Sequence, residues 1–145
     1  MKYFLKLNVV SLLFAIVIGI SIELQLNFYR IWRLTGWEAD TVNGVIAGLH
    51  LIGFVLSTIV FVFLISKWLE GKKSSFWAVI LWFPYLILFI ALFSYLFPIT
   101  NQGEMPAPVS GLIIIAQLIM YPIYLVMVTA FCTTSALVIE EKVLD

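Results

Sequence analysis

The chain has 145 residues, of which 63% are hydrophobic and only 11% charged, and eight basic and eight acidic residues give it no net charge. A soluble domain carries roughly a quarter charged residues, and a water-soluble fold has no way to cover this much apolar surface. The composition therefore excludes an ordinary soluble domain and predicts an integral membrane protein, while the balanced charge argues against a nucleic-acid partner.

Four apolar stretches are long enough to cross a bilayer as helices, because about 20 residues at a rise of about 1.5 Å span a hydrocarbon core of about 30 Å. Their unbroken apolar character excludes a β-barrel. No signal-peptide cleavage pattern follows the first stretch, so we expect it to be an uncleaved helix. The prediction is an all-α four-helix membrane bundle with short connectors, one domain over residues 1–145, with spans at approximately 7–28, 45–65, 76–97 and 112–137.

Basic residues near the spans are divided unequally between the two sides of the predicted bundle. One side collects Lys2, Lys6, Lys67, Lys72, Lys73 and Lys142, and the other has Arg30 and Arg33. Because lysine and arginine are enriched in cytoplasmic connectors, this bias predicts that both termini are cytoplasmic, in the plasma membrane. The segment from Tyr29 to Arg33 is predicted to lie along the opposite membrane surface.

Small residues indicate where the helices pack, since they let membrane helices approach closely. The first span carries a stripe with a spacing of four residues: Ser11, Ala15, Gly19, Glu23 and Asn27. We expect this stripe to face the other helices. In the second span Gly44, Gly48 and Gly53 are the predicted packing positions.

Polar residues on three spans fall at a similar depth. Counted from the ends of the spans, Glu23, His50 and Gln117 lie roughly 7–11 Å below the outer interface. Asn27, Ser94 and Tyr95 lie just above them. A carboxylate is costly in hydrocarbon, so Glu23 is expected to face the interior near His50. This layer is either a set of hydrogen bonds that locks the bundle, or an outward-open ligand or proton site that includes Glu23, His50, Gln117 and Asn27.

The chemistry of known enzyme sites is missing from the sequence. The single cysteine, Cys132, excludes an internal disulfide, and the single histidine, His50, excludes bis-histidine haem within one chain. We therefore predict no metal, no cofactor and no enzymatic activity. The expected role is an accessory, assembly or immunity-type subunit that packs against another membrane protein, forms a homo-oligomer or binds a lipid-like ligand. The alternative is a small oligomeric transporter or channel that uses the layer around Glu23 and His50.

Overall fold

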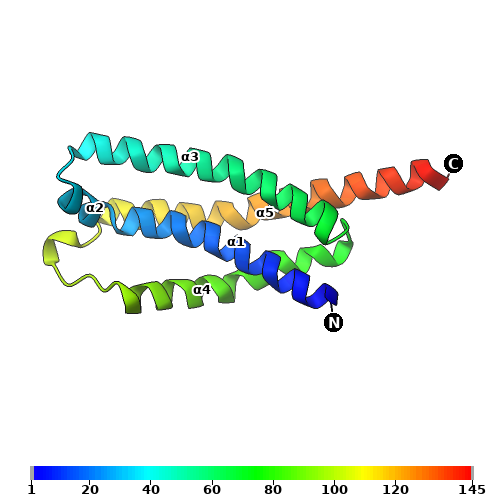
Figure 1. The fold of residues 1–145 in the computed structure, drawn as a ribbon, viewed down its shortest axis with the longest axis horizontal. Coiled ribbons are helices and arrows are strands. Elements are labelled where there is room, and N and C mark those ends of the chain that lie inside the picture. Colours follow the sequence, from blue (N-terminus) through cyan, green and yellow to red (C-terminus); the bar gives the residue numbers. More distant parts are fainter. Residues whose placement is uncertain (1, 145) are drawn as a thin grey trace.

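A computed structural model describes the backbone of residues 2–144 and the side chains of residues 2–138. Its helices are α1 (Lys2–Leu26), α2 (Phe28–Thr35), α3 (Ala39–Phe63), the π-helix η1 (Leu64–Trp68), the 3-10 helix η2 (Lys73–Trp77), α4 (Ala78–Leu96), the 3-10 helix η3 (Gln102–Glu104) and α5 (Pro108–Leu144). Residues 2–144 contain no strand. The long helices run side by side, and α1 begins and α5 ends at the same end of the bundle (Figure 1).

Four helical segments are long and apolar enough to cross a membrane. They are Lys2–Leu26, Ala39–Trp68, Lys73–Leu96 and Pro108–Val138, with mean hydropathy between 2.2 and 2.5. The expected set of four apolar helices is confirmed, and it indicates a membrane protein. The helices mostly extend beyond the predicted spans, because backbone hydrogen bonds continue over polar residues that hydropathy excludes. The second segment, for example, begins at Ala39 rather than near residue 45.

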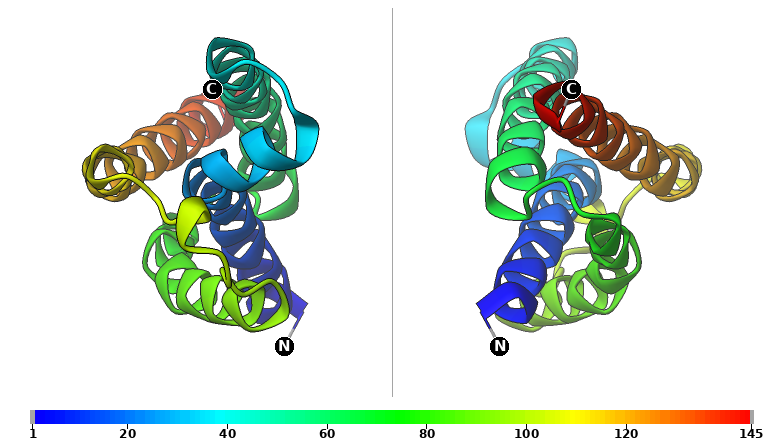
Figure 2. Two further views of the ribbon diagram at one scale, coloured as in Figure 1. Left: turned by 90° about the vertical axis from the view of Figure 1, so that its left-hand side faces the viewer. Right: turned by 90° about the vertical axis from the view of Figure 1, so that its right-hand side faces the viewer.

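The helix α1 lies at the centre of the bundle. Viewed along the bundle, α4 lies on one side of α1, and α3 and α5 lie on the other (Figure 2). Half of the most apolar window of α1 is buried inside the protein, against 17%, 22% and 17% in the three other segments. The first helix is therefore largely covered by protein, and the other three keep broad apolar surfaces.

The closest helix packing is between α1 and α4. Ser11, Ala15 and Gly19, from the predicted stripe of α1, are all buried. A Cβ atom built on Gly19 would lie 2.5 Å from Cδ1 of Phe89 on α4. Real Cβ contacts are longer than this, so only a glycine lets the Phe89 ring rest against α1 at this point.

The glycines of α3 have different surroundings. Gly44, Gly48 and Gly53 have no atom of the described chain within 4 Å of an added Cβ. Gly53 borders a pocket, and Gly44 is exposed. None of the three predicted packing positions is therefore in close contact with another helix of the described chain, and Gly44 and Gly53, nine residues apart, point to nearly opposite sides of α3.

The turn between η1 and η2 is held against α5. Glu70 and Gly71 both have positive φ angles, of 60° and 56°. A Cβ on Gly71 would lie 2.6 Å from Cβ of Ala136. Beside the turn, Ser74 donates a hydrogen bond of 2.7 Å to the Tyr3 hydroxyl. The start of α1, the turn and the second half of α5 are thereby joined at one end of the bundle.

Candidate functional site

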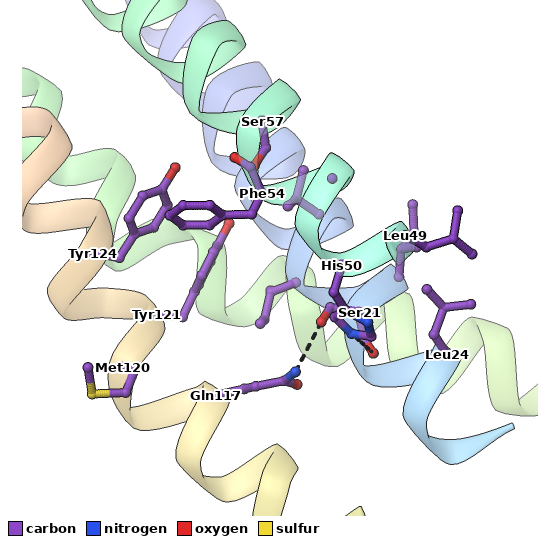
Figure 3. A pocket seen from close by; sticks show the side chains of 14 residues that line it. Ser21, Leu24, Leu49, His50, Phe54, Ser57, Gln117, Met120, Tyr121 and Tyr124 are labelled. Carbon is purple, nitrogen blue, oxygen red and sulfur yellow. Dashed lines mark hydrogen bonds between the residues drawn. The ribbon is translucent and has the colours of Figure 1, made fainter. Parts of the chain in front are cut away.

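A pocket of about 330 Å³ lies between α1, α3 and α5 (Figure 3), and we call it the lateral pocket. Its walls are mostly apolar. Several of its lining side chains are also exposed on the outer surface of the bundle: Ile20, Leu49, Phe54 and Met120. The lateral pocket therefore opens sideways, toward the surroundings of the helices.

One part of the lateral pocket is polar. Gln117 Nε2 donates a hydrogen bond of 3.2 Å to Ser21 Oγ, and His50 Nε2 lies 3.3 Å from the Ser21 carbonyl oxygen (Figure 3). His50 Nδ1 lies 2.7 Å from the Ile46 carbonyl oxygen. A neutral imidazole has one N–H, so it can donate to only one of these two carbonyls. Gln117 Oε1 is buried and accepts no hydrogen bond from the described residues.

Two tyrosines of α5 line the lateral pocket with their rings while their hydroxyl groups bind elsewhere. Tyr121 donates a hydrogen bond of 2.7 Å to the Phe14 carbonyl of α1. The Tyr124 hydroxyl lies 2.7 Å from Thr58 Oγ1 of α3. These two contacts fix α5 to both neighbours, so the apolar walls of the pocket are held in place by polar contacts at its edges.

A second pocket, of about 250 Å³, lies on the other side of α1, and we call it the Glu23 pocket. It is lined by Glu23 of α1, by Asn27 between α1 and α2, and by residues at and just after the end of α4, including Phe93, Ser94 and Phe97. Only 8% of Glu23 is exposed. Its Oε2 accepts a hydrogen bond of 3.1 Å from Asn27 Nδ2, whereas its Oε1 is buried without a partner in the described structure.

The predicted polar layer is thus divided between two pockets. His50 and Gln117 come together through Ser21, whereas Glu23 and Asn27 line the opposite pocket. The expected pairing of Glu23 with His50 is therefore corrected. Ser21 and Glu23 are two residues apart on α1, a rise of about 3 Å, so they lie at nearly the same level of the helix. Two residues along a helix, however, point to nearly opposite faces, and Glu23 points to α4.

Ser94 and Tyr95 were predicted to lie just above the polar layer, and the structure places them differently from each other. Ser94 lines the Glu23 pocket, as its predicted depth suggested. Tyr95, its neighbour, is 83% exposed and lies outside both pockets. Ser21 joins His50 to Gln117 but was not singled out from the sequence. Its signal was its place at the same depth as Glu23, on the other face of α1.

A charge cluster closes the end of the bundle beside the Glu23 pocket. The Glu104 carboxylate of η3 is 2% exposed and accepts hydrogen bonds from Arg30 Nε, at 3.1 Å, and from Arg33 Nε, at 2.7 Å. Arg30 also donates to the carbonyls of Phe97 and Pro98, at 3.2 and 2.8 Å. The guanidinium groups of Arg33 and then Arg30 hold the pKa of Glu104 below its usual range. From the sequence, Arg30 and Arg33 were expected only to mark the orientation of the bundle; the signal for their partner was that Glu104 is the single charged residue between Pro98 and Gly111.

No known protein family, curated protein or solved structure matches the chain. Within the described residues, no group of three or more histidine, cysteine, aspartate or glutamate side chains is placed to hold a metal ion. The lateral pocket and the Glu23 pocket are therefore the basis for proposing a function.

Proposed function

We propose that the chain is a non-enzymatic membrane protein that binds a lipid-like molecule in its lateral pocket. The observation that carries the proposal is an apolar pocket with a polar part, which opens between helices that are otherwise covered with exposed apolar side chains. A volume of about 330 Å³ falls within the range of ligand pockets, roughly 300–1,000 Å³. A ligand dissolved in the bilayer would enter from the side.

The polar part of the lateral pocket favours a ligand that donates a hydrogen bond. Gln117 Oε1 is an acceptor without a partner in the described structure, and leaving such a group buried and unpaired is unfavourable. A hydroxyl group on the ligand would satisfy it, while the hydrocarbon part would lie against Phe54, Met120 and Tyr121. An amphipathic long-chain alcohol has both features.

In this proposal the protein acts as an accessory subunit in the plasma membrane, with both termini in the cytoplasm. Gly44 and Gly48, which are four residues apart on α3 and have open space beside them, would meet another membrane protein or a second copy of the chain. Orientation is tested in a Cys132→Ser background by labelling cells with a membrane-impermeant thiol reagent. Glu38→Cys is expected to react from outside and Lys72→Cys only after the membrane is opened; the reverse pattern would invert the bundle.

Transport remains the alternative function, but no shared site supports it. Glu23 and His50, which were expected to form one pathway, line different pockets. Proton- or solute-dependent flux through liposomes that contain only this chain would favour transport over binding.

The binding proposal is tested with a long-chain alcohol that carries a photoactivatable diazirine. Gly53 and Gly48 lie on α3, and both have open space for a side chain within the described structure, but only Gly53 borders the lateral pocket. Gly53→Leu should fill the pocket and reduce crosslinking, whereas Gly48→Leu is the matched control. Crosslinked peptides are expected from α1, α3 and α5 around Ser21, Gly53 and Met120.

Competition by unlabelled alcohol should remove this signal. Equal crosslinking in the two leucine variants, or labelling spread evenly over lipid-facing residues, would reject a specific lateral site.

A further inference from the structure

The Glu23 pocket presents mainly hydrogen-bond acceptors. The single nitrogen Asn27 Nδ2 donates to the Glu23 carbonyl oxygen at 2.9 Å and to Glu23 Oε2 at 3.1 Å, so the amide donor is already in use. The oxygen Glu23 Oε1 is buried and has no partner among the described residues, although the side chain lines an open cavity. What the pocket lacks is a donor, and a positively charged donor suits a carboxylate best.

Aromatic rings form the rest of the wall. Phe93 and Phe97 lie with their ring centroids 4.9 Å apart, and both line the pocket with Glu23. Ring faces attract cations, most strongly where water is excluded. A carboxylate and two phenylalanine rings in a cavity of about 250 Å³ are the combination that recognises organic ammonium groups.

The nearest basic side chain does not supply this charge. Arg30 directs its nitrogens to Glu104 and to the carbonyls of Phe97 and Pro98, and it makes no ion pair with Glu23 in the described structure. Arg33 is likewise engaged with Glu104. Arg30 thus occupies the backbone carbonyls of two residues that line the cavity, Phe97 and Pro98.

We propose that the Glu23 pocket binds a primary ammonium group, with the Glu23 carboxylate as its anionic partner and Phe93 and Phe97 as the rings against it. Inorganic divalent cations fit less well, since they take six or more oxygen ligands. Here only Glu23, Asn27 and Ser94 offer side-chain oxygens, and Arg30 already binds the nearby carbonyls.

The ammonium group has two possible sources: the headgroup of phosphatidylethanolamine and a free small amine. Both present the same three N–H donors. Because the Glu23 pocket and the lateral pocket are on different sides of α1, ammonium binding does not depend on the function proposed above.

The test uses the full chain in nanodiscs of phosphatidylcholine. Free ethanolamine is titrated in one arm, and phosphatidylethanolamine is added to the nanodisc lipid in the other. Bound ligand is measured with isotope-labelled ethanolamine by equilibrium dialysis, or with labelled phosphatidylethanolamine by native mass spectrometry, in the wild type and in Glu23→Gln. Binding should weaken roughly thirtyfold or more in Glu23→Gln, since it removes one member of a buried charge pair. Glu38→Gln makes the same chemical change at an exposed position and should bind normally.

The outcomes separate the two sources. Saturation by the lipid alone assigns the site to the headgroup, and saturation by ethanolamine assigns it to a free amine. A second variant, Phe93→Leu, should weaken binding while leaving Glu23 intact. Binding that is equal in wild type and Glu23→Gln, or absent in both arms while circular dichroism shows a folded wild type, would overturn the proposal.

Discussion

The two sides of α1 differ in how closely they are packed. On one side, Gly19 lets Phe89 of α4 rest directly on the helix backbone. On the other, α3 and α5 lie around a pocket of about 330 Å³, and α1 is joined to α3 by one polar contact and to α5 by two. Glycines occur on both sides, but only Gly19 is enclosed. Small residues therefore permit close packing without ensuring it, and the open side is where a ligand or a partner has room.

The largest effect is expected from Gly19→Val, which places a branched side chain against the Phe89 ring. Overpacking of this kind costs roughly 1–3 kcal/mol, occasionally more. Thermal unfolding in mild detergent should show the loss, and Gly44→Val, at an open position of α3, is its control. If Gly19→Val and Gly44→Val unfold at the same temperature, α1 and α4 are not closely packed at Gly19.

An intermediate effect is expected from Glu104→Gln, which removes the charge that holds Arg30 and Arg33. Amide hydrogen exchange in α2 should become faster, while exchange in α1 stays slow; Glu38→Gln is the matched control. The pKa of Glu104 is lowered in the folded protein, so its contribution is present above the unfolded value of about 4.3 and is lost as the pH falls through the lower folded value. The protection factor of the α2 amides, which removes the intrinsic pH dependence of exchange, should therefore be unchanged between pH 7 and 5 and fall in stronger acid. If Glu104→Gln leaves the exchange of the α2 amides unchanged, the charge cluster does not hold α2 in place.

A smaller loss is expected from Tyr121→Phe, which removes the hydrogen bond from α5 to the Phe14 carbonyl. Such a bond contributes about 0.5–1.5 kcal/mol. Unfolding measurements should detect this, with the exposed Tyr95→Phe as the control. No difference between them would mean that the open side of α1 is held by something other than this contact.

The smallest effect is expected from Gly48→Ala. Within this chain the added methyl group meets open space, so better helix propensity should stabilise the protein by roughly 0.5–1 kcal/mol. A destabilised variant, or one with a smaller apparent mass in detergent, would instead show that this face is covered by a partner.

Sequence reasoning predicted the features that depend on one helix at a time. The four long apolar helices and the buried stripe from Ser11 to Gly19 both follow from length and helical repeat. Length and helical repeat do not determine which helix packs against each face. Glu23 and Ser21 face opposite ways, and only the packing of α4 against α1 decides which pocket receives the acid.

The contacts across the ends of the bundle also could not be predicted from the sequence. The pairing of Arg30 with Glu104 joins positions 74 residues apart, and three separate connectors have to be placed before it is apparent. The sequence showed that Arg30, Arg33 and Glu104 lie on the same predicted side of the bundle. It did not show that Glu104 is buried, because hydropathy treats every charge in a connector as solvated.

The dominance of the α1–α4 contact has a consequence for how the protein is made. Seventy residues separate the end of α1 at Leu26 from the end of α4 at Leu96. At about 5–20 residues per second, a ribosome takes roughly 4–14 s to cover that distance. During this interval α1 and α3 are the only long helices available, and the face that carries Glu23 has nothing to cover it. The half-synthesised chain therefore leaves this face of α1 uncovered until α4 is complete.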